Sequence, residues 1–515
     1  MSGRLFFKGR KSLDSRFRGN DGRFSSSPCK RGPGGFGFMF IFLFAVMALV
    51  PVHAFASEKK MVLSLDEAVQ RAIKVNAEVK EAEFNVEVYK SKKEEADAAR
   101  FPQIDVVAYG SLSPRARLID GKSVESSTNI NKPSYDGVFG RADFLAIQPI
   151  YTFGKIDAYR QAAAHGVAAY EAGAKVKATE VAMLVKQAYW GLLLTKELKA
   201  FLADLKGQLD DATDKVKRQL DAGAPNVDQV DLFKLQTYQG EINKYIALVD
   251  ENHAKAMYGL RLLVGLLNSP VELEIKDEYL VPAEYHAEDF KTYKDAALKD
   301  RVEFLQLKEG LAAKEKLIEA QTADYYPQVF VAAMYSIAGA TNRDHLNNPY
   351  ITDDFNHAYG GAVLGFKWGF DFGIRKGKVN EAKADYLMLK MKQYYAEGGV
   401  PYQVQDAYQQ LLESDREIKA LSGAYHTAKQ WVVASLSNFD LGVGEARDIA
   451  DSVKAYAQIR ADYFQAVYNQ RMAIANLQHA TGEDAQTIPY TVSRDPLRDM
   501  NEVQREVDEL NKGAK

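Results

Sequence analysis

Apolar positions along this chain follow two different periods, and the change from one to the other is abrupt. Large apolar residues recur every three or four positions at 194, 198, 201, 202, 205 and 209, which predicts an amphipathic helix. The runs 57–101, 150–224, 283–326 and 402–488 contain no proline and are rich in helix-forming residues. We therefore expect long helices that pack like coiled coils, with a break or kink at "AEGGVPYQ" (396–403), where a proline follows two glycines.

Alternation with a period of two predicts strands at about 103–112, 141–153, 328–338 and 359–372. In the last of these, small or charged residues oppose a row of large apolar ones, as in a membrane barrel strand with lipid outside and water inside. A half-buried strand of a soluble sheet is the alternative. The lipid-facing set would be Leu364, Phe366, Trp368, Phe370 and Phe372.

Four blocks of sequence recur in the same order. Residues 72–110 align without gaps to 297–335 at an offset of 225, so that "FPQI" falls on "YPQV". "LAIQPIYTFG" (145–154) falls on "LGFKWGFDFG" (364–373) at an offset of 219, which places its alternate residues, Leu145 to Phe153, on the same outward face. The turn at 220–230 and the helix end at 260–265 also recur, at 439–449 and 477–482.

The chain is thus predicted to be a duplication of about 220 residues, each copy reading helix, strand, loop, strand, long helix, turn, helix. We expect the first repeat at 57–283, the second at 284–490 and a polar tail at 491–515. Four strands are too few to close a membrane barrel, for which about eight are needed. Several chains would therefore have to pool their strands, which indicates an oligomeric conduit.

Charge is distributed unevenly. Residues 1–38 carry nine Lys or Arg against two Asp, a charge of +7, which leaves −10 for the rest of a chain of net charge −3. An acidic body disfavours a nucleic-acid partner. The uncharged run 38–50, followed by Ala54-Phe55-Ala56, predicts a leader and signal peptide over 1–56, and an N-terminal membrane anchor is the alternative. The single cysteine, Cys29, would be removed with the leader, leaving no thiol chemistry.

No pattern of residues predicts an enzyme. The eight histidines are scattered, none in a metal-binding His-Glu-x-x-His pattern, and "GVG" (442–444) lacks the other features of a nucleotide-binding loop. We expect no catalytic, cofactor-binding or metal-binding residues.

These repeated blocks resemble the TolC-like outer membrane efflux protein family over residues 62–484. The resemblance rests on "LSLDEAVQRAIKVNAEVKEAE" near the mature start, "FPQI"/"YPQV", "YTFGK"/"FDFGI" and "DAGAPNVDQV"/"DLGVGEARDI". It implies a mainly α-helical chain with a membrane β-barrel portion. In this family a homotrimer forms a 12-stranded barrel in the outer membrane, continued by a periplasmic α-helical barrel.

The implied function is an outer membrane channel of a tripartite efflux or type I secretion system, with a periplasmic adaptor (membrane fusion) protein and an inner-membrane transporter as partners. The alternative is a periplasmic coiled-coil adaptor or scaffold protein.

The resemblance also implies working residues. Asp448 and Asp451 match family aspartates that narrow the periplasmic aperture, and their i, i+3 spacing puts both on one helical face. Spacing alone favours a solvated pair on an exposed helix, and only the alignment with the family supports the aperture. Gly223 and Gly442 match turns that adaptors grip, although glycine also suits any tight reversal.

The family pattern is incomplete at these turns. Phe439 and Gly444 stand where a tyrosine and an arginine of the family's closed state are expected, so that latch is in doubt. In the first repeat Gln229, flanked by Asp228 and Asp231, occupies the gate position, which leaves that copy's part in the gate doubtful.

Overall fold

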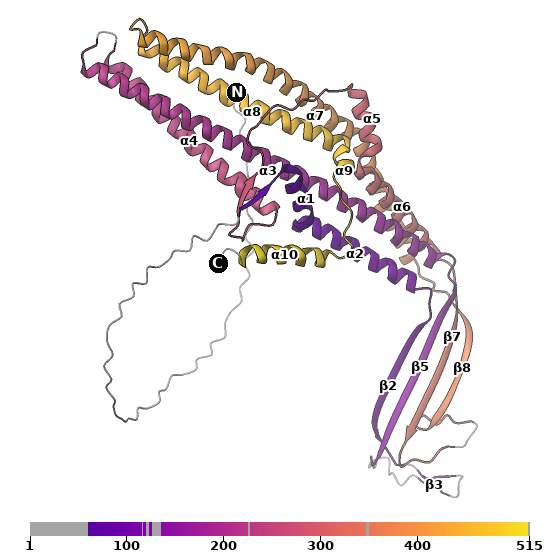
Figure 1. Cartoon of the computed structure of the whole chain (residues 1–515). Coiled ribbons are helices and arrows are strands. Elements are labelled where there is room, and N and C mark those ends of the chain that lie inside the picture. Colours follow the sequence, from indigo (N-terminus) through magenta and orange to yellow (C-terminus); the bar gives the residue numbers. More distant parts are fainter. Residues whose placement is uncertain are drawn as a thin grey trace, which may run out of the picture. The chain divides into compact units, whose positions relative to one another are not determined.

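Two helices of 67 residues each, α3 (Lys155–Asp221) and α7 (Ile374–Asp440), run through most of the molecule (Figure 1). The computed structural model describes residues 60–115, 117–119, 123–125, 135–224, 227–346 and 350–512. The expected leader and signal peptide lie outside these residues. Residues 56–515 form one unit, to which all of the following refers. None of its described helices is both long and apolar enough to cross a membrane.

The two halves contain the same elements in the same order, which confirms the duplication. The first has α1 (Leu65–Val75), α2 (Ala77–Ala98), β2 (Gln103–Ser113), β5 (Gly137–Tyr151), α3 and α4 (Gln229–Leu263). The second has α5 (Phe290–Asp300), α6 (Val302–Ala323), β7 (Gln328–Ala340), β8 (His357–Lys367), α7 and α8 (Ala446–Thr481). Short elements complete the chain: β1 (Lys60–Leu63), β3 (Arg117–Ile119), β4 (Ser123–Glu125), β6 (Glu272–Ile275), α9 (Glu483–Thr487) and α10 (Pro496–Lys512).

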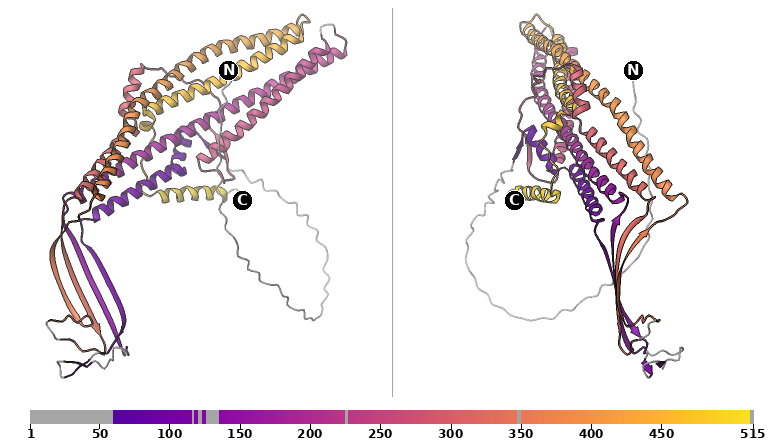
Figure 2. Two further views of the ribbon diagram at one scale, coloured as in Figure 1. Left: turned by 180° about the vertical axis from the view of Figure 1, so that it is seen from behind. Right: turned by 90° about the vertical axis from the view of Figure 1, so that its right-hand side faces the viewer.

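The repeated elements form single layers. Helices α2, α3, α6 and α7 pack side by side in that order, and the strands that continue from them form one antiparallel sheet in the order β2-β5-β7-β8 (Figure 2). At the other end, α3 with α4 and α7 with α8 form two long helical hairpins. Each half therefore supplies two neighbouring helices and two neighbouring strands to a shared wall.

Of the expected break or kink at "AEGGVPYQ", the break is wrong, because α7 continues through Pro401. The residues that follow the proline are buried: Val404 and Leu411 are fully enclosed in a cluster with Ala297 of α5 and Leu477 of α8. Packing on both sides offsets the hydrogen bond that a proline removes from a helix. Local sequence is thus overruled by tertiary contacts.

Residues 496–512, which belong to the expected polar tail, form helix α10. Its Val503 and Val507 are buried in a cluster with residues of α1 and α3. Lys80 of α2, only 4 % exposed, forms ion pairs with Glu83 at 2.7 Å and with Asp499 of α10 at 3.2 Å. A buried lysine needs such partners, because an unpaired charge away from water is very unfavourable. The amphipathic spacing of the valines is the sequence signal for this helix.

The four-stranded sheet has one largely apolar face and one mixed face, on which the charged side chains of the strands lie among apolar ones. Paired residues lie on the same face, and the face alternates along each strand. The apolar face carries Ile104, Val106, Leu112, Val138, Phe144, Val331, Tyr335, Ile337, Leu364 and Phe366. The opposite face carries Gln103, Asp105, Arg141, Asp143, Ser336, His357 and Lys367. Such a sheet is suited to separate a lipid phase from an aqueous one.

The gap-free alignment of the two outward sets is wrong for the first repeat. Leu145 pairs with Met334 and Leu364 pairs with Val331, and these two β7 residues, three apart, point to opposite faces. The residue that shares the face of Leu364 is Phe144, which pairs with Tyr335.

A β-bulge is the cause of this discrepancy. The ladder shifts register between Pro149 and Tyr151, so Ile150 has no partner in it. Ile147 pairs with Gln103 in the first copy, and Lys367 pairs with the equivalent Gln328 in the second, so these two residues correspond at an offset of 220. The first residues of the long helices, Lys155 and Ile374, correspond at an offset of 219. The extra residue in the first copy reverses the face of every position before it.

Strand β8 ends at Lys367, five residues before the expected end at 372. Asp371 accepts hydrogen bonds from the backbone N–H groups of Gly373 and Arg375 and so caps the start of α7. Trp368, Phe370 and Phe372 therefore lie on the turn between strand and helix, where they are 48 %, 77 % and 109 % exposed. Leu364 and Phe366, which are on the strand, are 74 % and 71 % exposed.

The bulge yields a test with paired variants. If the apolar face meets lipid, as the sequence analysis expects, Phe144→Lys places a charge in hydrocarbon and destabilises the folded state by roughly 2–4 kcal/mol at mid-depth. Leu145→Lys points to the mixed face and should be tolerated. The amount of heat-resistant folded protein recovered from outer membranes measures both. The reverse order of severity would show that the strand is in the register of the gap-free alignment.

Candidate functional site

The first hairpin tip closes on Gly223. After α3 ends, Gly223 adopts φ +70°, and its N–H donates to the carbonyl of Leu220 at 3.0 Å. The N–H of Ala224 donates to Gln219 at 3.0 Å. These bonds satisfy the carbonyl groups that a helix end leaves open, and the left-handed conformation favours glycine. The predicted Gly223 turn is therefore a helix C-terminal cap, at the tip of the first hairpin.

The second hairpin tip also has a glycine cap, but its turn is tighter. Gly442 has φ +76°, and its N–H donates to Phe439 at 3.0 Å. The N–H groups of Val443 and Gly444 both donate to the carbonyl of Asn438, at 3.1 and 3.0 Å. A Cβ at Gly444 would lie 2.9 Å from the backbone N of Phe439, so no larger residue fits without a shift. The close turn thus explains why the arginine expected by resemblance is absent here.

Phe439 is not a surface group at this tip. Its ring is 2 % exposed and lies in the core formed by both hairpins. That core includes Leu205, Leu209 and Val216 of α3, Leu235 and Ile242 of α4, Val432 of α7, and Ile449, Val453 and Tyr456 of α8. Without a hydroxyl, Phe439 holds the hairpins together by packing alone.

Asp448 and Asp451 both lie on the exposed side of the first turns of α8, while Ile449, Ala450 and Ser452 between and beside them are buried. The pair therefore shares one solvent-facing surface, as their spacing predicts. Arg447 approaches Asp451 with its Nε 3.8 Å from Oδ2, an exposed contact that water screens strongly. The sequence analysis did not include Arg447, although its i, i+4 spacing from Asp451 is visible there.

The corresponding carboxylates of the first repeat have a structural role. Asp228 is the N-cap of α4 and accepts a hydrogen bond from the N–H of Asp231 at 2.9 Å. Asp231 in turn accepts from the N–H of Asp228 at 3.4 Å, which completes a capping box. These two side chains satisfy the helix start, whereas Asp448 and Asp451 of the second repeat are not committed to a helix cap.

Two ion pairs link the hairpins near their tips, and sequence reasoning missed both. Lys215 of α3 pairs with Asp440 at the end of α7, and its Nζ lies 5.7 Å from the ring centroid of Phe439. Lys454 of α8 lies 3.7 Å from Glu241 of α4. Each pair joins positions more than 200 residues apart, so no local pattern could reveal it.

Farther from the tips, Arg460 of α8 is surrounded by aromatic rings. Its guanidinium carbon lies 4.5 Å from the ring centroid of Phe201 and 5.5 Å from that of Phe464. It donates to the Tyr456 hydroxyl at 2.8 Å. Burial, with a hydrogen bond to Tyr425, raises the pKa of Tyr456, so that this hydroxyl stays protonated. Arg460 therefore joins α8 to α3 through cation–π contacts.

Within the described residues, no group of three or more His, Cys, Asp or Glu side chains could hold a metal ion.

Known proteins resemble this chain in sequence and in fold. Residues 294–483 match the sequence model of the outer membrane efflux protein family. No match was found among curated protein sequences. The similar solved structures include a membrane protein from Pseudomonas aeruginosa, with a TM-score of 0.65 at 15 % identity over 83 % of this chain and 92 % of that one.

Two further structures have named functions. The CmeC outer membrane channel of Campylobacter jejuni gives a TM-score of 0.63 at 16 % identity, covering 87 % of this chain and 89 % of its own. The open state of the Neisseria gonorrhoeae MtrE outer membrane channel gives 0.62 at 15 % identity, covering 81 % and 88 %. This chain therefore has the fold of these outer membrane channels, and most of its second repeat matches the sequence model of the outer membrane efflux protein family.

Proposed function

We propose that this protein is the exit duct of a tripartite efflux or type I secretion system, which passively conducts substrates from periplasmic partners to the exterior. One observation carries the proposal: the sheet is largely apolar on one face, mixed on the other and open at both edges, β2 and β8. A periplasmic adaptor or scaffold is not favoured, because such a protein has no use for a two-sided membrane sheet that continues each helix pair.

We further propose a homotrimer. Unpaired strand edges are unstable in a bilayer, where no water satisfies their backbone groups. Pairing β8 of one copy with β2 of the next closes a barrel, and three copies of a four-stranded sheet supply 12 strands. The same step joins α7 of one copy to α2 of the next, which continues the helical wall.

In this arrangement the apolar strand face, with Leu364 and Phe366, meets outer membrane lipid. Trp368, Phe370 and Phe372 on the following turn occupy the membrane boundary, where aromatic side chains are favoured. The long helices extend into the periplasm, and the hairpin tips form the inner end of the duct.

The tips supply two further parts of the proposal. Asp448 and Asp451 from three copies would place six carboxylates around the periplasmic aperture, where they repel one another and attract cations. The Gly223 and Gly442 turns would contact a periplasmic adaptor, which links the duct to an inner-membrane transporter. The two glycine caps present the outermost backbone of each hairpin, which supports this assignment.

The Lys215–Asp440 and Lys454–Glu241 pairs would hold the closed aperture. Both join the α3/α4 hairpin to the α7/α8 hairpin, and both are largely exposed. Exposed pairs contribute up to about 1 kcal/mol each, so they bias the aperture without locking it. They would replace the latch that Phe439 and Gly444 cannot form.

The assembly is tested by fractionation and crosslinking. The full chain should be recovered in the outer membrane, and a short amine-reactive crosslinker should yield a trimer as the largest product. A soluble periplasmic monomer would contradict both the location and the duct.

The aperture is tested in planar bilayers. Replacing Asp448 and Asp451 with Ala should raise single-channel conductance and weaken block by divalent cations, because six negative charges leave the narrowest part. Asp228→Asn, at the cap of α4, serves as a control for charge near the tips. If conductance and block match those of the unmodified protein, the two residues do not form the aperture.

The proposed latch is tested by charge exchange. Lys215→Asp or Asp440→Lys alone creates a like-charge contact between hairpins and should increase the open fraction up to about fivefold. The double variant restores attraction and should return the open fraction toward its original value. Equal opening in all three variants would mean that this pair does not bias the gate.

A further inference from the structure

A cavity of about 1050 Å³ lies where the helices of the wall meet the strands. It is lined by residues of α2, α3, α6 and α7 and by the ends of the four strands nearest the helices. The hairpin tips, with the aspartates discussed above, lie at the opposite end of the helices (Figure 1). Nothing in the proposed assembly so far gives this cavity a role.

The cavity opens on the mixed side of the sheet. Its lining includes Gln103, Ile147, Phe330 and Lys367, which belong to the strand face that carries Asp105, Arg141 and Asp143; Val329, which pairs with Phe366, lines it from the other face. The face with the charged residues points away from the apolar surface formed by Leu364 and its neighbours. A ligand could therefore reach the cavity from the aqueous side of the sheet.

The cavity exists because small residues of α3 and α6 line it. The floor contains Ala162, Ala163, Gly166, Ala169, Gly310 and Ala313. A Cβ added at Gly166 would lie 3.1 Å from Cδ1 of Tyr89, and one added at Gly310 would lie 3.2 Å from Cδ2 of Leu389. Tyr89 and Leu389 already lie close to these two glycines, so larger side chains at Gly166 and Gly310 would clash with them. The cavity volume therefore depends on small side chains along α3 and α6.

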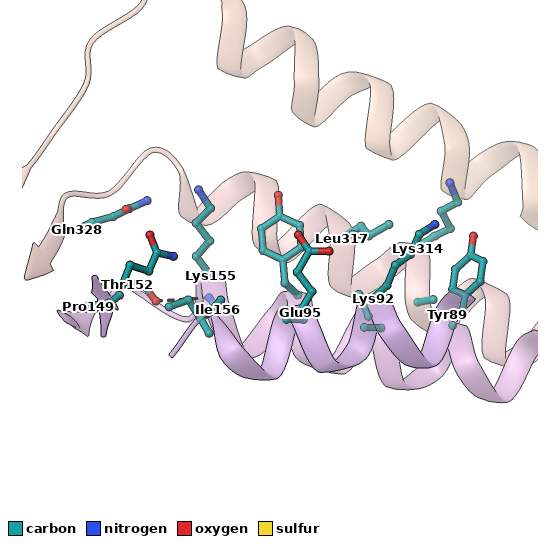
Figure 3. A pocket seen from close by; sticks show the side chains of 18 of the residues that line it. Tyr89, Lys92, Glu95, Pro149, Thr152, Lys155, Ile156, Lys314, Leu317 and Gln328 are labelled. Carbon is teal, nitrogen blue, oxygen red and sulfur yellow. Dashed lines mark hydrogen bonds between the residues drawn. The ribbon is translucent and has the colours of Figure 1, made fainter. Parts of the chain in front are cut away.

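The charges that line the cavity are predominantly positive. Four lysines, from α2, α3, α6 and β8, face a single carboxylate, Glu95: they are Lys92, Lys155, Lys314 and Lys367. Figure 3 shows Lys92, Lys155 and Lys314 projecting to the same side of the helix layer as Tyr89 and Glu95. This contrasts with the chain after the leader, which carries a net charge of −10.

Two of the lysines are engaged and two are not. Lys155 pairs with Asp324 at 2.5 Å, and Lys314 pairs with Asp385 at 2.6 Å. Lys92 and Lys367 have no carboxylate partner among the described residues. Lys92 instead lies 4.2 Å from the ring centroid of Tyr89, which stacks on Tyr170 at 3.8 Å.

We propose that this junction cavity binds organic anions with an apolar body. Lys92, on α2, and Lys367, at the end of β8, supply the positive charge that attracts the acid group. The apolar part lies against side chains such as Ile147, Ile156 and Leu317 and against the aromatic ring of Phe330. The binding site stands on the cavity itself; only the statement that its ligand is a transported substrate rests on the proposed duct.

Physical chemistry favours this ligand class over the others. An organic cation would be repelled by the lysines, and an inorganic anion would leave the apolar wall uncovered. A neutral molecule would gain only apolar burial, whereas an amphipathic anion gains both. Because the cavity is open to solvent and Lys92 and Lys367 are exposed, the binding should be weak and salt-dependent, as a substrate in transit requires.

Binding is measured by calorimetry, and conduction is measured in planar bilayers with the same preparation. Full-length protein in a neutral detergent is titrated with naphthalenesulfonate, naphthol and naphthylmethylammonium by isothermal calorimetry. The sulfonate should bind most tightly, and its affinity should fall as NaCl is raised. Lys92→Gln with Lys367→Gln should weaken sulfonate binding about fivefold for each charge removed.

Matched variants separate this site from general charge effects. Lys196→Gln with Lys419→Gln removes two exposed lysines that do not line the cavity and should leave the affinity unchanged. Ala163→Phe fills the cavity without changing charge and should also weaken binding. Size-exclusion chromatography confirms that each variant keeps the parent assembly.

The outcomes are distinct. Equal affinity for naphthol and the sulfonate, no measurable binding, or equal losses in the cavity and control lysine variants would overturn the inference. Sulfonate binding that depends on the cavity, in a protein that forms no conducting pore in bilayers, would support the site while removing the proposed duct.

Discussion

The unsatisfied edges of the four-stranded sheet constrain the whole molecule. A sheet with one apolar face is stable only where that face is covered and its edge strands are paired, and one copy of this chain provides neither. Closing the sheet requires further copies, and the helices that continue from the strands must then close in the same order. The spacing of helices and strands, the equal lengths of α3 and α7 and the short junctions between them all follow from this common wall.

The two ends of the wall are chemically different. At the hairpin tips, buried apolar residues and exposed carboxylates coexist on the same few helical turns, so packing and charge are separated by face. At the junction with the strands, small side chains and lysines line an open cavity. The long helices thus connect an acidic end with a basic one. A charged molecule inside the duct would experience a different potential at each end, so anions would be concentrated near the junction and cations near the tips.

Much of the architecture could be predicted from the sequence, because duplication makes each half a check on the other. The positions of Pro102 and Pro327, the long proline-free runs and the glycine turns indicate the elements and their order. Three features could not be predicted locally. Pro401 lies inside a helix because neighbouring helices enclose the residues after it. Helix α10 has a local signal in its valine spacing, but its ion pair with Lys80, more than 400 residues away in sequence, has none. The contacts between hairpins, such as Lys215 with Asp440, join distant parts of the chain that only the fold brings together.

The bulge at Ile150 has a consequence for how the two halves have diverged. A gap-free comparison of the copies treats them as equivalent at every position, but the strand before the bulge and the helix after it obey different offsets. An insertion or deletion in one copy has therefore been absorbed where the ladder tolerates an unpaired residue, with the start of the long helix left undisturbed. The two halves of the wall are consequently not interchangeable. A segment transplanted from one copy to the other across the bulge would turn its apolar side chains to the aqueous face of the sheet.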